Sequence, residues 1–412
     1  RRDHLPEAAL SLVLPAGADA HPTESAGLAS LVAKVLPEGA AGRTARDMAI
    51  WVDGLGAHLG VAVGYDAMIV RLHTLSEHLE AGLDLLAAVA LEPAFLDEEV
   101  ERCRAERLDA IRRYRDEPAE VAADVLAELL YADHPYGRLT RGRLDSVARI
   151  DRDDLVAFHE NRFSPEGALL VGCGDLPANF EDLVSGRFGG WSGPQADSRP
   201  PAAISTADSP GIVLVDRPGS GQSEIRIGGI GIRRNDEREI AARVTNAILG
   251  GLFNSRLNMN LREDKGWTYG ARSSLSLRRS PGPVTLRAAV ETAVTADAVR
   301  EMMGEIEGLR SASPSEAEME TARGALTRSL PLRFQTNGQI AGTLVEQAVY
   351  GLEDDYWSRF PGRINLVSAD QVREAAVHLL DPEALAVLVV GDAGAVRSGL
   401  ERQGPVTEKE PP

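Results

Sequence analysis

The sequence predicts an α+β protein with two homologous domains in tandem, each a sheet packed against helices. Three observations lead to this fold class. The chain has 412 residues, which is too long for a single hydrophobic core. Helix-like and strand-like stretches occur in clusters instead of alternating as strict β-α-β units. One long stretch of the first half also recurs in the second half, which indicates a duplicated domain.

The repeat aligns residues 150–175 with residues 367–392 without a gap, at an offset of 217 residues (367 − 150). Asp153 falls on Asp370, one proline coincides, and both copies end in Gly-Asp. An ungapped match of this length predicts the same helix followed by the same strand in both halves.

The helices expected ahead of these copies, 96–113 and 314–330, also correspond at nearly the same offset. Between the halves lies a stretch rich in Gly, Pro, Ser and Ala, with few large apolar side chains, which is typical of a linker. We therefore expect one domain at 1–188, a linker at 189–209 and a second domain at 210–412.

Alternating apolar residues predict strands in the first half, and apolar residues spaced three and four apart predict helices. Pro93 and glycines end several of these stretches, and Asp151 is placed to cap a helix. The expected strands are 8–15, 57–63, 67–75 and 168–172. The expected helices are 24–36, 43–55, 79–91, 96–114, 119–130 and 151–161.

The stretch 249–277 predicts a helix followed by a strand. Its leucines recur near the helical period at Leu252, Leu257 and Leu261. Gly266 ends the helix, and the alternating run 274–277 predicts a strand. Arg262 therefore lies in the last helical turn, and Tyr269 lies at the start of the strand, seven residues later.

A tight turn at Gly266 can bring the Arg262 and Tyr269 side chains to one side. A guanidinium and a phenol that face a cleft can donate hydrogen bonds to a carbonyl oxygen that gains negative charge. The alternative is structural: Arg262 balances the helix C-terminus, and Tyr269 packs partly into the core. The stretch by itself leaves both interpretations open.

The run LREDKGWTYGARSSLSL resembles the C-terminal-half motif of the pitrilysin, insulin-degrading enzyme and mitochondrial processing peptidase superfamily. In that family an Arg and a Tyr seven residues apart lie in the half-molecule that carries no metal, and they face a zinc site in the other half. The resemblance implies a clamshell half built from two α+β domains. It also implies a metal-free subunit of the short, two-domain bacterial type that forms a heterodimeric zinc peptidase.

Active members of that family carry an inverted zinc motif, H-x-x-E-H, in a context similar to G-L-A-H-F-L-E-H-M-L. Residues 27–36 of this chain match the frame but not the ligands. Ser30 and Lys34 occupy the two His positions, and Ala33 occupies the position of the catalytic Glu. A further Glu ligand, about 76 residues later in the family, falls on Ala110. The resemblance therefore implies no metal in this chain and a zinc ion in the partner subunit.

The other candidate ligands do not replace that motif. The eight histidines form no His-x₃-His pair, and Cys103 and Cys173 are too few for a structural zinc site. Lys34 can place its ammonium where the metal would be, against Asp109 or Glu106, and we treat this as a hypothesis.

Composition excludes several classes of partner. The net charge is −18 and no Lys/Arg-rich run occurs, which argues against nucleic acid and anionic membranes. No apolar run reaches the length of a membrane span. The chain begins with Arg instead of Met, which indicates that an N-terminal segment was removed or trimmed. The compartment stays open, with the bacterial periplasm favoured over the cytoplasm.

The resemblance implies a subunit that pairs with a zinc-bearing homologue to cleave peptides and is inactive alone. Tyr269 would donate a hydrogen bond to the tetrahedral oxyanion, and Arg262 would hold a substrate carbonyl or the same oxygen. The alternative is an inert scaffold, similar to the metal-less core subunits of the respiratory cytochrome complex.

Overall fold

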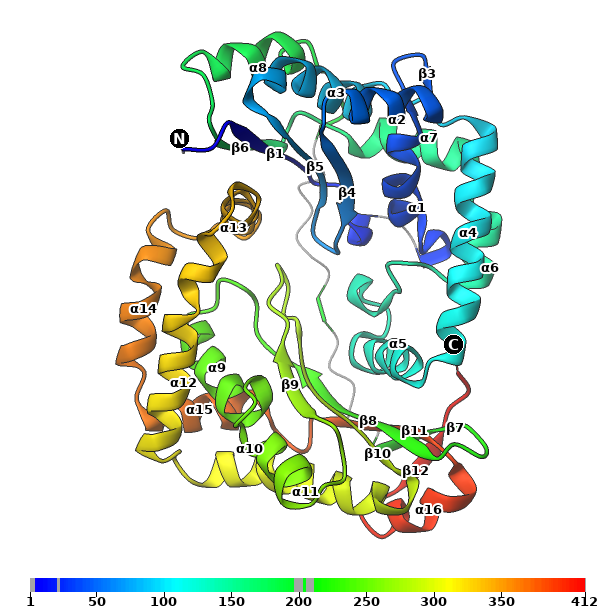
Figure 1. Ribbon diagram of the computed structural model, residues 1–412. Helices are drawn as coiled ribbons and strands as arrows, with labels where there is room; N and C mark the ends of the chain where they lie inside the picture. Colours follow the sequence, from blue (N-terminus) through cyan, green and yellow to red (C-terminus); the bar gives the residue numbers. More distant parts are fainter. Residues whose placement is uncertain (1–3, 21–22, 196–202, 205–210, 412) are drawn as a thin grey trace. The chain divides into compact units, whose positions relative to one another are not determined.

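The computed structural model describes residues 4–20, 23–195, 203–204 and 211–411 (Figure 1). Most of the linker expected at 189–209 lies outside the described residues. By contacts the chain divides into two compact units, each built from three segments. Unit 1 comprises Arg1–Arg113, Arg138–Pro200 and Pro331–Gly351. Unit 2 comprises Tyr114–Gly137, Pro201–Leu330 and Leu352–Pro412.

Unit 1 contains a four-stranded sheet in the order β4-β5-β1-β6, and its three pairings are antiparallel. The strands are β1 (Glu7–Leu14), β4 (His58–Val63), β5 (Met68–Leu75) and β6 (Leu169–Gly174). A short two-stranded sheet pairs β2 (Gly39–Ala40) with β3 (Arg43–Thr44). The helices of the first half are α1 (Leu28–Val35), α2 (Ala45–Gly54), α3 (Leu79–Leu91), α4 (Asp97–Asp116), α5 (Pro118–Tyr131), α6 (Leu144–Arg149), α7 (Arg152–Arg162) and α8 (Phe180–Phe188).

Strand β1 is buried on both faces, which explains its almost continuous apolar sequence. Because side chains alternate along a strand, Leu10 and Leu12 point into the main core with α1, α3 and α7. Ala9 and Val13 point into a second, smaller core. The helix that closes this second core is α13 (Asn337–Val349), which comes from the second half of the chain.

Helix α13 is held on the unit 1 sheet by a buried polar contact as well as by apolar packing. The Asn337 side-chain amide donates to Glu7 Oε1 at 3.0 Å and to the Glu7 carbonyl oxygen at 3.5 Å. The thiol of Cys173 on β6 donates to Asn337 Oδ1 at 3.8 Å. Since Asn337 is fully buried, these contacts satisfy a group that would otherwise destabilise the interface.

Unit 2 contains a six-stranded mixed sheet in the order β12-β7-β11-β8-β10-β9. The pairings of β7 with β11 and β12 are parallel, and the others are antiparallel. The strands are β7 (Ile212–Asp216), β8 (Gln222–Ile230), β9 (Ala271–Leu275), β10 (Pro283–Glu291), β11 (Ala386–Gly391) and β12 (Val406–Glu408). The remaining helices are α9 (Glu239–Asn246), α10 (Arg256–Asn258), α11 (Thr295–Ser311), α12 (Glu316–Arg328), α14 (Tyr356–Leu366), α15 (Ala369–Leu379) and α16 (Ala393–Glu401).

Helix α5 of the first half packs on β8 and β11 of unit 2. The Arg226 guanidinium on β8 donates to the Ala119 carbonyl oxygen at 3.3 Å, and the Tyr131 hydroxyl donates to the Pro281 carbonyl oxygen at 2.9 Å. Gly228 permits the close approach, because a Cβ there would lie 3.0 Å from a Leu126 methyl group.

The two halves therefore exchange one helix each. Helix α5 begins at residue 118 and α13 begins at residue 337, close to the offset of the repeat, so they occupy equivalent places in the two halves. Figure 1 shows α13 beside β1 and β6, and α5 beside β8 and β11. Each sheet has one face covered by a helix from the other half of the sequence.

The structure confirms the α+β fold class and the repeat. Helices α7 and α15 start and end 217 residues apart, and so do β6 and β11. The caps match as well, since Asp151 and Ser368 each accept from the backbone three residues later in a complete capping box. The helix expected at 24–36 begins later, at Leu28, because Gly27 adopts a left-handed φ of 100° and leaves only a short 3₁₀ turn before it.

The domain boundaries at 1–188 and 210–412 stay a prediction, and the helix exchange gives them a direct test. Fragment 1–188 lacks α13, and fragment 210–412 lacks α5, so each would expose one apolar face of its sheet. We expect each fragment alone to be aggregated or partly folded, and co-expression to yield a soluble complex, as measured by size-exclusion chromatography and circular dichroism. A fragment that is a stable, folded monomer by itself would contradict the structural role given to the exchange.

Candidate functional site

The segment from α9 to β9 in unit 2 carries Arg262 and Tyr269, and it is not the regular helix expected from the leucine spacing. Two π-helical turns, η6 (Ala247–Gly251) and η7 (Met259–Asp264), flank the short helix α10. At Gly250 a Cβ would lie 2.3 Å from the Ser273 backbone nitrogen, so only glycine fits this close approach to β9. A π-turn inserts one extra residue and rotates the side chains that follow it, which is common at functional sites.

Asn258 fixes the path of this segment from its middle. Its side chain is only 4% exposed. Its amide nitrogen donates to the Phe253 carbonyl oxygen at 2.6 Å, and its Oδ1 accepts from the Ala271 backbone nitrogen at 3.3 Å. One buried amide therefore links the loop before α10 to the first residue of β9.

Neighbouring helices hold the segment from outside. Asn260 donates to Glu305 at 2.7 Å and to Glu301 at 3.2 Å, and Lys265 lies 3.4 Å from Glu301, all on α11. The Lys265 ammonium also lies over the Trp267 ring, 5.4 Å from its centroid. These contacts bind both ends of the η7 turn to one helix.

Arg256 of α10 makes a two-pronged contact with Glu318 of α12, at 2.6 and 3.2 Å. Burial by itself raises the pKa of the Glu318 carboxyl. Hydrogen bonds from Arg256 and Ser315 outweigh this effect and lower the pKa to about 2.

Arg262 lies in the η7 turn with its side chain 40% exposed. Its Nε lies 3.2 Å from Glu263 Oε1, and its guanidinium stacks over the Phe253 ring, 4.7 Å from the centroid. Such a stack at an exposed site is worth about 0.5–1 kcal/mol. The two terminal nitrogens of Arg262 have no partner in the part of the chain that the structure describes, so they can donate to a ligand.

Gly266 ends the turn with a left-handed φ of 67°. The Gly266 backbone nitrogen donates to the Arg262 carbonyl oxygen at 3.1 Å, and that of Trp267 donates to the Leu261 carbonyl oxygen at 2.9 Å. This is the glycine stop expected from the sequence. The strand begins at Ala271, so Tyr269 precedes the strand instead of lying at its start.

Tyr269 is 94% exposed, and within the described residues its hydroxyl has no hydrogen-bond partner. It is therefore not packed into the core, which removes the structural alternative for this side chain. Arg262 and Tyr269 lie on either side of the Gly266 turn, and no hydrogen bond between them is present among residues 211–411. Both side chains are free to meet a ligand, and both are hydrogen-bond donors.

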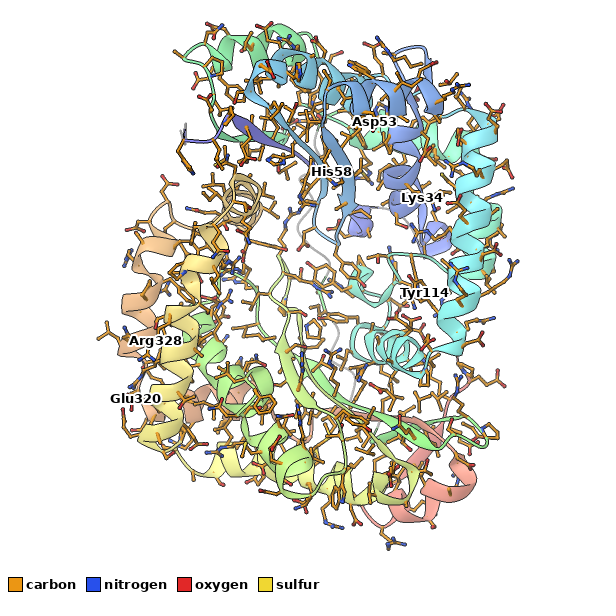
Figure 2. All side chains as sticks on the ribbon, viewed as in Figure 1. Lys34, Asp53, His58, Tyr114, Glu320 and Arg328 are labelled. Carbon is orange, nitrogen blue, oxygen red and sulfur yellow. The ribbon has the colours of Figure 1, made fainter. Side chains whose placement is uncertain are left out.

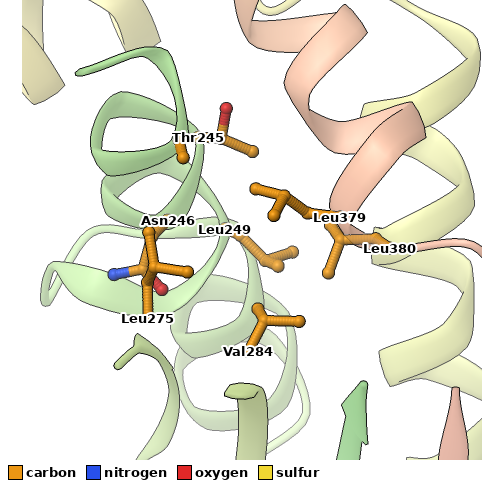
Figure 3. Close-up of a pocket in the computed structure, with 8 residues that line it drawn as sticks. Thr245, Asn246, Leu249, Leu275, Val284, Leu379 and Leu380 are labelled. Carbon is orange, nitrogen blue, oxygen red and sulfur yellow. The ribbon is translucent and has the colours of Figure 1, made fainter. Parts of the chain in front are cut away.

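A small apolar pocket behind η6 is not a substrate site (Figure 3). Its volume of about 10 Å³ is close to what a single water molecule requires. Most of its lining residues are leucine or valine, among them Leu249 of η6, Leu275 of β9 and Val284 of β10, and α9 contributes the remainder.

The positions of the degenerate zinc motif lie in unit 1. Ser30, Ala33 and Lys34 are on α1, and Ala110 is half-buried on α4. Ser30 and Ala33 are buried, and the Ser30 hydroxyl oxygen has no hydrogen-bond partner within the described residues. Two methyl groups, a hydroxyl and an ammonium do not form a zinc ligand set, so the residues present do not fit the metal.

Lys34 pairs with Glu106 of α4 at 2.6 Å, one helical turn before Ala110. Figure 2 shows Lys34 on the side of α1 that faces α4. Arg102 bonds the other Glu106 oxygen at 2.8 Å, and the hydrogen bonds from both cations lower the pKa of Glu106. Of the two expected partners, Glu106 is therefore the correct one. Asp109 pairs with Arg112 instead, at 2.5 Å.

Three further properties of the described residues concern a reactive thiol, a metal-ligand cluster and a membrane-spanning helix. Burial raises the pKa of the Cys103 thiol to about 11, so it stays protonated at neutral pH. Within the described residues, no group of three or more His, Cys, Asp or Glu side chains is placed to hold a metal ion. No helix in the same part of the chain is both long and apolar enough to cross a membrane.

Comparison with protein families gives two matches. Residues 2–143 match the model described as insulinase (peptidase family M16), and residues 149–326 match the model described as peptidase M16 inactive domain. An uncharacterized zinc protease of Mycobacterium leprae is 26% identical over 390 residues, which cover 92% of this chain and 86% of that protein. An uncharacterized zinc protease of Mycobacterium tuberculosis is 28% identical over 379 residues, which cover 90% of this chain and 85% of that protein.

Solved structures are also similar. A peptidase M16 inactive domain from Pseudomonas fluorescens has a TM-score of 0.88 at 25% identity, covering 95% of this chain and 94% of the other. A protease from Helicobacter pylori has a TM-score of 0.87 at 15% identity, covering 94% of this chain and 95% of the other. At this low identity, the similarity to the Helicobacter pylori protease shows a shared fold alone.

The Arg256–Glu318 contact predicts a pH-dependent stability. Because the folded pKa of Glu318 lies below its ordinary value of 4.5, its contribution is complete above about pH 4.5 and is lost as the pH falls toward 2. The variant Glu318→Gln keeps the cap on Ser315 but loses the charge, so we expect it to be less stable by about 1 kcal/mol at pH 7. Urea titrations at several pH values measure this. Equal losses at pH 7 and at pH 2 would contradict the assignment.

Proposed function

Since the chain belongs to the M16 peptidase family, we propose that it is the non-zinc-binding subunit of a heterodimeric zinc metallopeptidase that cleaves peptides. In this proposal Arg262 and Tyr269 act at the zinc site of a homologous partner that carries H-x-x-E-H. The partner supplies the zinc ion, which polarises the scissile carbonyl, and the general base.

The observation that carries the proposal is the exposed pair of donors on an anchored segment. Tyr269 presents an unpartnered phenol, and Arg262 presents two unpartnered terminal nitrogens. Asn258 and the contacts to α11 fix the backbone beneath them. Donors that are held in place before the reaction stabilise a developing oxyanion without a cost of reorganisation.

The two side chains have different tasks in this proposal. The Tyr269 hydroxyl donates a hydrogen bond to the oxygen that becomes negative in the tetrahedral intermediate. The Arg262 guanidinium, oriented by the Phe253 ring, holds a neighbouring carbonyl of the peptide and keeps the scissile bond in register. Because the residues at Ser30, Ala33, Lys34 and Ala110 do not fit zinc, we expect the chain to be inactive alone.

The test is reconstitution with a zinc-bearing homologue. We expect the mixture to cleave peptides while neither chain does so alone. We expect Tyr269→Phe to lower kcat on the order of 10²-fold, as for the loss of one oxyanion donor, and Arg262→Ala to lower kcat/KM at least as much. Steady-state kinetics measure both effects.

Matched controls separate chemistry from assembly. Tyr114→Phe and Arg300→Ala change exposed residues of unit 2 that are outside the site, and we expect both to keep activity. Analytical ultracentrifugation verifies that each variant still forms the heterodimer. Full activity of the partner alone, with no effect of Arg262 or Tyr269 substitutions, would instead favour the inert scaffold.

A further inference from the structure

Phe253 is an exposed aromatic residue that none of the tasks above requires as a substrate contact. Its side chain is 63% exposed, and one face of its ring lies under the Arg262 guanidinium. Single exposed apolar side chains are ordinary on protein surfaces. Phe253 differs from the others because it touches the residue proposed to hold the substrate.

The backbone of Phe253 is not a loose loop. Its carbonyl oxygen accepts the 2.6 Å hydrogen bond from Asn258, the buried residue that also binds the first residue of β9. Two residues later, Ser255 donates its backbone nitrogen to the Leu252 carbonyl oxygen at 3.3 Å. The ring is therefore presented from a fixed position, as a recognition surface requires.

We propose that Phe253 contacts one side chain of the substrate, namely that of the residue whose carbonyl oxygen Arg262 binds. This contact gives the peptidase a preference for a large apolar residue at that position of the substrate. This inference rests on the function proposed above. The centroid of the ring lies 4.7 Å from the guanidinium carbon. A carbonyl oxygen bound by Arg262 lies about 2.9 Å from a guanidinium nitrogen, and the side chain of that residue stands on the Cα next to the carbonyl. A carbonyl bound by Arg262 therefore brings its own side chain within reach of the ring.

The chemistry of the surface selects an apolar side chain. Arg262 covers one face of the ring, which leaves the remainder of its apolar surface open to a second contact. Met259, three residues before Arg262 in the same turn, is also 40% exposed and adds adaptable apolar surface. Burying these surfaces against a Leu or Phe side chain is favourable, whereas a Ser or Asp gains nothing from the contact.

The experiment uses the reconstituted heterodimer and a set of peptides that differ only at one residue beside the cleavage point, as Leu, Phe, Ser or Asp. We expect the wild type to prefer Leu and Phe. We expect Phe253→Ala to reduce the ratio of kcat/KM for Leu over Ser by about 10-fold, chiefly through KM, and Phe253→Leu to retain most of it. Leu366→Ala, at an exposed position of α14, is the matched control and should change nothing.

The remaining outcomes distinguish a failure of the role proposed for Phe253 from a failure of the proposed function. An unchanged preference in Phe253→Ala, with Tyr269→Phe still slow, overturns this inference and leaves the proposed function standing. A uniform fall across all peptides shows that Phe253 only orients Arg262, and weakened dimer assembly with an unchanged preference shows that it contacts the partner; both overturn the specificity role. If Arg262 and Tyr269 substitutions have no effect, the proposed function itself fails.

Discussion

The reciprocal exchange of α5 and α13 is the constraint on which both units depend. Each sheet buries its second face against a helix that the other half of the sequence supplies. A unit without its exchanged helix would expose apolar surface, so neither half of the duplication is dispensable. This gives a physical reason for keeping a first half whose zinc-motif positions are Ser30, Ala33, Lys34 and Ala110. That half provides α5, on which the sheet of unit 2 packs.

Within unit 2, hydrogen bonds and ion pairs of Asn258 and Glu301 hold the backbone of the segment that carries the exposed candidate site residues. Asn258 ties the loop at Phe253 to β9, and Glu301 binds both Asn260 and Lys265 from α11. The side chains that remain outside are the ones suited to meet a ligand: an aromatic ring, a guanidinium and a phenol. A buried side-chain amide destabilises the fold unless its nitrogen and its oxygen are both hydrogen-bonded. The two hydrogen bonds of Asn258 therefore favour a single backbone conformation of the segment.

Much of the fold could be predicted from the sequence, because the repeat and the alternation of apolar residues are local signals. The exchange of α5 and α13 could not be predicted, because the apolar pattern of a helix shows that one face is buried but not which sheet buries it. The glycine stop at Gly266 and the exposure of Arg262 and Tyr269 agree with the functional interpretation. The leucine spacing does not predict the π-turns or the position of Asn258. These features involve tertiary contacts: η6 approaches β9 closely at Gly250, and Asn258 is hydrogen-bonded to Phe253 and Ala271.

The central claim is that Tyr269 stabilises the tetrahedral intermediate more than the substrate. The most direct measurement compares two affinities of the reconstituted heterodimer, with the general base of the partner replaced by Gln. One ligand is a phosphinic peptide that mimics the tetrahedral intermediate, and the other is the uncleaved peptide of the same sequence. We predict that Tyr269→Phe weakens binding of the phosphinic peptide on the order of 10²-fold and leaves substrate affinity nearly unchanged. Equal losses for both ligands, or no loss for either, would contradict the account.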